Sequence, residues 1–297
     1  MVANKSLVDL TDYYARIELV GEDCINLLDR LSTNDVSTLQ QAGQGLSSVL
    51  TTNKGRIIDL LGLFLFEDRF LLVSSSDSIR KVIEWIEFYT IMEDVQVKDV
   101  SDTTFHFRSI NNPVLEKKLC LDQVSVGATT SATLGEISCS AIKSEMGGLS
   151  AIDVVGRLID RNDVSYELQR ESEMMDHDEF EKFRINVGVP AYGKELCEDY
   201  NPIEAGLLNH ISFNKGCYIG QEVVARLNTY DKVQRKLVKL TWSGDLISRD
   251  LTVDGKIIGK VTSAGYGEGL GYIRNAYSTN GQVVQCNESD VIVGITI

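Results

Sequence analysis

A change of pattern near Asp231 constrains the fold more than any other feature of this sequence. After that point the apolar residues come only in short runs, and glycines separate the runs. The runs cover residues 237–242, 257–262, 270–273, 283–286 and 291–297. Short strands joined by glycine turns are typical of a small β-barrel or sandwich. We therefore predict two regions, residues 1–230 and an all-β domain over residues 231–297.

The first region mixes strand and helix patterns. Residues 14–20 alternate apolar and polar side chains, which predicts a half-buried strand. Asp23 is a candidate cap for the helix that follows, and Ser76 with Asp77 for a second helix. Further strands are predicted at residues 57–66, 70–73, 95–100 and 104–108, and a third helix at 178–184 with Phe180 and Phe183 inward. This order indicates an α+β fold and not a series of βαβ units. Residues 124–140 show no clear pattern.

Composition disfavours several classes of function. The chain has 297 residues, 43% of them apolar, and a net charge of −14. It can bury one large core or two smaller ones, and its acidic surface repels phosphate backbones. We therefore expect no general nucleic-acid binding, whereas a small anionic ligand needs only a few local cations. The six cysteines form no C-x-x-C pair, and no signal core or spanning run is present. These features predict a cytoplasmic protein with free thiols, no membrane partner and no metal site.

Residues 209–226 carry the most varied set of polar groups. They read N-H-I-S-F-N-K-G-C-Y-I-G-Q-E-V-V-A-R. Around two glycines the segment places a cation, a thiol, a phenol, an amide, a carboxylate and a guanidinium, namely Lys215, Cys217, Tyr218, Gln221, Glu222 and Arg226. Few structural turns need so many different functions. The alternative is a loop leading into a helix, with Glu222 and Arg226 as a surface pair one helical turn apart.

The stretch K-G-C-Y-I-G-Q-E-V-V-A-R resembles the signature K-G-C-[FY]-x-G-Q-E of the YgfZ family of folate-binding proteins. The resemblance covers nearly the whole chain, through L-S-T-N-D-V-S-T-L at residues 31–39 and L-T-T-N-K-G-R-I-I-D at 50–59. G-K-I-I-G-K-V-T-S at 255–263 resembles the opening of the barrel that the family shares with the glycine-cleavage T-protein. The resemblance implies a three-lobed T-protein-like ring of ferredoxin-like α+β lobes, two of them in residues 1–230, with a C-terminal β-barrel. Folate would then bind in a central channel that faces the barrel.

The resemblance also implies roles for individual residues. Tyr14 and Val189 match positions where the family can place a tryptophan against folate. Asn186 matches a T-protein glutamate that contacts the pterin, and Asp59 matches one of two adjacent T-protein aspartates, the other being Leu60 here. The implied ligand is tetrahydrofolate or a one-carbon-substituted folate. The implied folate-binding residues are Tyr14, Asn34, Asp59, Arg184, Asn186, Val189, Lys215, Tyr218, Gln221, Glu222 and Arg226, and the implied catalytic residues are Cys217 and Asp59.

Three functions remain open at this point. The resemblance implies an accessory protein that supports iron–sulfur cluster assembly or repair, with client or assembly proteins as partners and an indirect effect on tRNA modification. A folate-dependent aminomethyltransferase or a related demethylase is the alternative, favoured by Asp59 and the barrel. Cys217, the neutral Asn186 and the missing second aspartate oppose it. The third possibility is folate binding without any chemistry, so the sequence does not decide whether the protein is an enzyme.

Structural explanations stand beside the functional ones. Asp59 lies in an apolar run and is either a buried, paired carboxylate or an exposed residue on the outer face of a strand. Cys217 is either a reactive thiol near Lys215 or a small packing residue. His106, between two phenylalanines, is expected to be structural, and His177 is expected at a solvated helix start.

Overall fold

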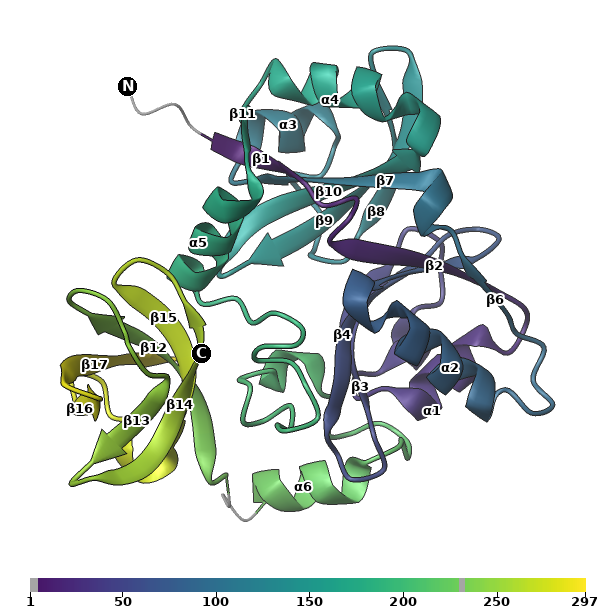
Figure 1. Cartoon of the computed structure of the whole chain (residues 1–297). Coiled ribbons are helices and arrows are strands. Elements are labelled where there is room, and N and C mark those ends of the chain that lie inside the picture. Colours follow the sequence, from purple (N-terminus) through teal and green to yellow (C-terminus); the bar gives the residue numbers. More distant parts are fainter. Residues whose placement is uncertain (1–4, 230–232) are drawn as a thin grey trace.

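The computed structural model describes residues 5–229 and 233–297. Two α+β lobes and a barrel are arranged as a ring, and the segment 188–220 lies across its middle (Figure 1). The predicted α+β class with a C-terminal barrel is confirmed. The predicted boundary at residues 230 and 231 lies outside the described residues and stays a prediction. In the described ranges, no helix has both the length and the apolar character needed to cross a membrane.

The first lobe is a five-stranded sheet that packs against two helices. The strand order is β3-β4-β5-β2-β6. The strands are β2 Tyr14–Val20, β3 Gly45–Thr51, β4 Ile57–Leu65, β5 Phe70–Ser75 and β6 Gln96–Asp99, and the helices are α1 Cys24–Leu31 and α2 Ile79–Tyr89. Leu27 and Leu28 of α1 and Val82 and Ile86 of α2 are buried in one apolar cluster with the sheet. The strands predicted at residues 14–20, 57–66 and 70–73 are confirmed, and the last two form an antiparallel pair.

Both predicted helix caps of this lobe are wrong. Asp23 holds the N-cap position of α1, but its carboxylate accepts a hydrogen bond from the Asp94 N–H at 2.8 Å and caps nothing in α1. Ser76 and Asp77 lie in a 3₁₀ turn, Ser76–Ser78, that precedes α2. The Ser78 hydroxyl at the end of this turn donates to the Asp59 carboxylate. At Asp23, a long-range partner has therefore replaced the local cap that the sequence favours.

The second lobe is a six-stranded sheet with two short helices. Its order is β11-β1-β7-β10-β9-β8. The strands are β1 Lys5–Asp9, β7 Thr104–Ile110, β8 Thr129–Leu134, β9 Ile137–Met146, β10 Leu149–Arg157 and β11 Glu173–Met175, and the helices are α3 Pro113–Lys118 and α4 Arg161–Gln169. Leu115 and Leu168 of these helices join one core cluster with Phe107 and Val154 of the sheet. Residues 124–140, which lack a clear pattern, contribute β8 and the start of β9.

Helix α5, His177–Val187, leads from the second lobe toward the barrel (Figure 1). It begins with a reciprocal capping box between Asp176 and Glu179, so the helix starts as expected next to His177. Phe180 is buried and Phe183 is partly buried, as predicted. The helix ends at Gly188, whose φ of +80° is left-handed and where a β-carbon would lie 2.5 Å from the Ile297 side chain.

The C-terminal domain is a closed barrel with the order β12-β15-β14-β13-β16-β17. Its strands are β12 Arg235–Trp242, β13 Asp250–Val253, β14 Lys256–Ala264, β15 Glu268–Arg274, β16 Val283–Cys286 and β17 Ser289–Thr296. Val238, Leu240, Val261 and Val293 fill its core. The predicted barrel is confirmed, although the short strand β13 has too few apolar residues to be found by pattern. Helix α6, Gln221–Thr229, lies between the first lobe and the barrel (Figure 1).

Candidate functional site

Lys215 anchors the signature loop, residues 209–220, to the first lobe. Its ammonium lies 2.7 Å from both the carbonyl and the carboxylate of Asp29, 3.1 Å from the Ser32 carbonyl and 2.6 Å from the Asn34 carbonyl. These acceptors surround the C-terminal end of α1, where free carbonyls attract a cation. The Lys215 side chain is only 1% exposed, and burial lowers its pKa against the opposing effect of Asp29. Lys215 therefore has a structural task, and its binding of folate stays a prediction.

Cys217 is exposed, so the interpretation as a packing cysteine is wrong. The next residue, Tyr218, is buried, and burial raises its pKa to about 12. The Lys215 ammonium lies 5.5 Å from the centre of the Tyr218 ring while it contacts the acceptors of the first lobe. An anchored lysine and a buried tyrosine thus hold an accessible thiol between them. The reactivity of that thiol stays a prediction.

Gly220 shows why the signature contains its second glycine. Its φ is +85°, and a β-carbon there would lie 2.6 Å from the Thr52 carbonyl oxygen. The Thr51 hydroxyl donates to the Ile219 carbonyl at 2.6 Å. The signature loop therefore contacts residues 50–59, the second segment that resembles the family, and the two make one surface at the edge of the first lobe.

Helix α6 carries the remaining signature residues on its outer side. Glu222 and Arg226 are exposed, whereas Val224 is buried. Within the described part of the chain, no salt bridge joins Glu222 to Arg226, so the expected surface pair is not formed. Gln221 is half-buried. The predicted folate contacts of Gln221, Glu222 and Arg226 stay predictions.

Asp59 is fully buried, so the interpretation as an exposed strand residue is wrong. Its carboxylate accepts hydrogen bonds from the Leu60 and Ser75 N–H groups, both at 2.8 Å, and from the hydroxyls of Ser75 and Ser78. No cation in the described ranges forms a salt bridge with it. Burial raises the pKa of Asp59 despite these hydrogen bonds. Asp59 fastens β4 to β5 and to the turn before α2, and its catalytic role stays a prediction.

Tyr14 is on β2, and strand β5 lies between β2 and the strand β4 that carries Asp59. It pairs with Ser75 across the β2–β5 ladder, and Ser75 is the residue that donates to Asp59. The Tyr14 side chain packs against two apolar clusters, one that contains Phe64 of the first lobe and one that contains Val189 after α5. We call this surface, where both sheets meet the end of α5, the inner junction. Tyr14 and Val189 thus pack against the same apolar cluster.

Arg184 and Asn186 instead face the barrel. The Arg184 guanidinium is 4% exposed and donates to Glu181, Glu195 and Ser263. Asn186 is exposed, and its side-chain amide donates to Glu268 of β15 at 3.1 Å. Both contacts fasten α5 to the barrel, so the structure assigns these residues an architectural task. Asn34 is similar, since its amide donates to the Ser47 carbonyl at 2.9 Å.

Sequence reasoning missed a buried charged group at the inner junction. Arg108 of β7 and Asp153 of β10 form a two-point ion pair, and His106 contacts the same carboxylate at 2.7 Å. Arg108 lies 5.5 Å from the Tyr14 ring centre. The available signal was weak: an arginine and an aspartate, each on the same face of a strand as buried apolar residues.

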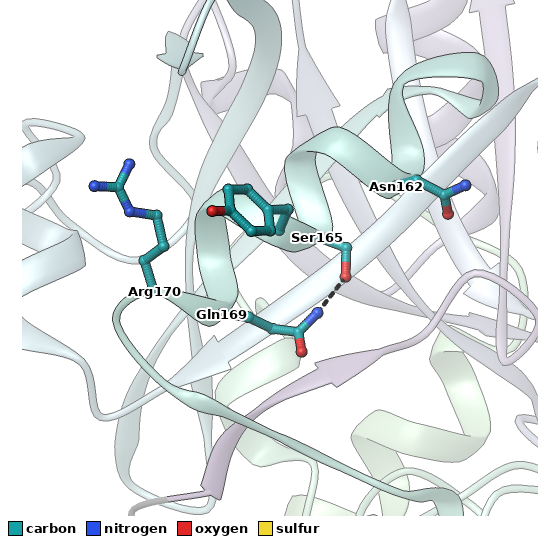
Figure 2. A pocket seen from close by; sticks show the side chains of 5 residues that line it. Asn162, Ser165, Gln169 and Arg170 are labelled. Carbon is teal, nitrogen blue, oxygen red and sulfur yellow. Dashed lines mark hydrogen bonds between the residues drawn. The ribbon is translucent and has the colours of Figure 1, made fainter.

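Two pockets lie away from most of these residues. The first has a volume of about 460 Å³, and its lining residues belong to α4 and its end. Figure 2 shows these residues, two of which are joined by a 2.9 Å hydrogen bond from the Gln169 side chain to the Ser165 hydroxyl. A second pocket, of about 390 Å³, is lined by Tyr14 together with Asp12, Asp99 and Arg161. The described residues include no group of three or more His, Cys, Asp or Glu side chains placed to hold a metal ion.

Comparisons with known proteins identify a matching family and several relatives. Residues 2–110 match the family model described as the GCVT N-terminal domain. A chloroplastic protein of Arabidopsis thaliana, named as a candidate transferase, is 31% identical over 305 residues, which cover 95% of this chain and 68% of the relative. The aminomethyltransferase of Bacillus subtilis is 27% identical over 307 residues, covering 92% of this chain and 80% of the relative. That of Thermotoga petrophila is 26% identical over 266 residues, covering 84% and 72%.

A solved structure shares the fold. It is the glycine cleavage system aminomethyltransferase T from Bartonella henselae, with a TM-score of 0.83 over 99% of this chain and 86% of that one. The sequence identity is 19%, so the likeness concerns the fold alone.

Proposed function

The chain belongs to the glycine-cleavage T-protein superfamily, and from this premise we propose that it is a folate-binding accessory protein of the YgfZ type. It binds tetrahydrofolate or a one-carbon-substituted folate in the cytoplasm, and it supports iron–sulfur cluster assembly or repair in client proteins. Its effect on tRNA modification is then indirect. The observation that carries the proposal is the exposed Cys217 on a loop that Lys215 anchors.

The side chains of the inner junction are of the kind that would hold the ring system of a folate. Tyr14 offers an aromatic face, and Phe183 and Val189 add apolar surface in the same cluster. Two buried polar atoms on the adjoining sheet, His106 Nδ1 and Ser144 Oγ, have no hydrogen-bond partner among the described residues. Tyr14 and Val189 would hold the flat ring, and the bound folate would supply a carrier for one-carbon groups.

Two features favour the accessory role over one-carbon transfer by this chain. Every oxygen of Asp59 already accepts hydrogen bonds from Leu60, Ser75 or Ser78, and Leu60 stands where the T-protein has its second aspartate. The exposed Cys217 thiol, by contrast, can reach a client protein. A thiolate is the ligand that iron–sulfur clusters take, so an accessible cysteine on a fixed loop suits this task.

An aminomethyltransferase is the second candidate. The observation that favours it is the similarity, over most of the chain, to relatives named as aminomethyltransferases. Asp59 would have to serve this reaction, although it is 0% exposed.

One experiment separates the two candidates. Purified protein is titrated with tetrahydrofolate in a calorimeter and is then assayed for methylene-tetrahydrofolate formation with an aminomethylated lipoyl carrier protein. We expect binding without product. Product formation would favour the aminomethyltransferase, and absence of binding would contradict both candidates. The variant Tyr166→Leu, which removes an exposed tyrosine of α4, should bind tetrahydrofolate as the unaltered protein does.

A further inference from the structure

One face of the six-stranded sheet carries a polar group among apolar side chains. On this face Ile110 and Met146 belong to one apolar cluster, and Ile142 and Val155 belong to another, which also contains Phe64 of the first lobe. His106 lies directly opposite Val155 in the β7–β10 ladder, and Asp153 lies directly opposite Ile142 in the β9–β10 ladder. Arg108 and Asp153 stand directly opposite each other in the β7–β10 ladder.

Arg108 is held in a fixed plane. Its Nε lies 2.7 Å from Asp153 Oδ1 and its terminal nitrogen 3.1 Å from Oδ2, which is the two-point geometry of an arginine fork. The side chains of Arg108 and Asp153 are 13% and 5% exposed. Burial alone would raise the pKa of Asp153, but Arg108 and His106 hold it well below its usual range. The pair is therefore charged at neutral pH.

His106, on the same strand face as Arg108, contacts the same Asp153 carboxylate. Burial lowers its pKa more than Asp153 raises it, so the imidazole is neutral. Its Nε2–H then donates to Asp153, which leaves Nδ1 as a bare acceptor without a partner in the described ranges. A neutral histidine leaves the Arg108–Asp153 pair as the charged unit of this face.

The charged unit contacts the Tyr14 ring. The Arg108 Cζ atom lies 5.5 Å from the ring centre, and the His106 ring centre lies 5.6 Å from it at a tilt of 35°. A cation at this distance is attracted to the ring face. A buried ion pair is a weak source of stability, since apolar side chains of similar size often stabilise a core as well. Geometric control of the neighbouring ring is a better reason for Arg108 and Asp153 to be there.

We propose that Arg108 is a positioning residue, which Asp153 holds against Tyr14 so that the tyrosine ring is fixed as an aromatic face for a flat ligand ring. The ligand's identity rests on the proposed function. The position of the Tyr14 ring does not, because it can be measured without any ligand.

The first test observes Tyr14 in the free protein. Tyrosine rings are labelled with carbon-13, and the Tyr14 signal is assigned by its loss in Tyr14→Phe. The test variant is Arg108→Met with Asp153→Leu, because removing both charges together avoids an unpaired buried charge. We expect the Tyr14 signal to move or broaden while the signal of the exposed Tyr166 stays in place. An unmoved Tyr14 signal in the folded variant would overturn the proposal.

The second test measures coupling in tetrahydrofolate binding. We expect the paired replacement of Arg108 and Asp153 to weaken binding about 3- to 10-fold, in keeping with the usual strength of aromatic contacts. In a Tyr14→Leu background the same replacement should have almost no further effect. Equal weakening in both backgrounds would show that Arg108 acts elsewhere. If the unaltered protein does not bind tetrahydrofolate, the proposed function fails while the ring signal still decides the positioning role.

Discussion

The signature loop and the inner junction each bury a cation, but the two cations fix different things. Lys215 is surrounded by backbone carbonyls and Asp29, so it fixes the path of a loop and leaves the adjacent thiol exposed. Arg108 is bound by the single carboxylate of Asp153, which fixes the plane of its guanidinium group. That group in turn lies over the Tyr14 ring. A point-like ammonium suits several carbonyls, whereas a planar guanidinium suits a carboxylate and an aromatic face. One region thus leaves a thiol exposed, and the other holds a cation against the face of an aromatic ring.

The largest expected effect comes from breaking the ion pair at the inner junction. Asp153→Leu leaves Arg108 buried without its carboxylate and should lower the free energy of unfolding by about 3–5 kcal/mol. Adding Arg108→Met should recover most of that loss, which urea denaturation would measure. If the double variant is no more stable than Asp153→Leu alone, the two side chains do not act as a pair.

A smaller effect is expected at the signature loop. Lys215→Met removes the hydrogen bonds to three carbonyls at the end of α1 and should cost about 1–3 kcal/mol in the free energy of unfolding. Lys54→Met, at an exposed lysine in the turn before β4, is the matched control and should change stability by less than about 0.5 kcal/mol. Equal stability of the two variants would mean that Lys215 does not anchor the loop.

The smallest effect is a pH dependence at the inner junction. Burial lowers the pKa of His106 in the folded chain, whereas the unfolded chain takes up a proton near 6.5. The stability that His106 contributes is therefore complete above that pH and is lost as the pH falls below it, by at most about 1.4 kcal/mol per pH unit. His106→Asn should flatten this slope between about pH 7 and about pH 5 in thermal melts. An unchanged slope would assign the effect to other groups, such as His210, whose pKa burial also lowers.

The contrast between the two regions also explains what the sequence could predict. The strand at residues 14–20 and the barrel were predictable because alternation and glycine spacing are local signals. The signature loop was found because its polar residues are contiguous. The cap predicted at Asp23 was wrong because its carboxylate bonds to Asp94, which is distant in sequence, and the caps predicted at Ser76 and Asp77 were wrong because these residues lie in a 3₁₀ turn before α2.

The inner junction could not be assembled in the same way. The β7–β10 ladder register brings Arg108 and Asp153 together, and packing between the two sheets brings Tyr14 of β2 to them. A single arginine or aspartate in an apolar strand has no sequence pattern that identifies its partner. The burial of Asp59 was one of two predicted possibilities, and the hydroxyls that satisfy it lie 16 and 19 residues away.

The most direct test of the account replaces the exposed thiol. Cys217→Ser is compared with Cys120→Ser, the matched variant at the other exposed cysteine, in cells that lack the protein and depend on an iron–sulfur enzyme. We predict that Cys217→Ser folds and binds tetrahydrofolate nearly normally but fails to restore the enzyme's activity, whereas Cys120→Ser restores it. Full restoration by Cys217→Ser would contradict the claim that the anchored loop exists to present this thiol.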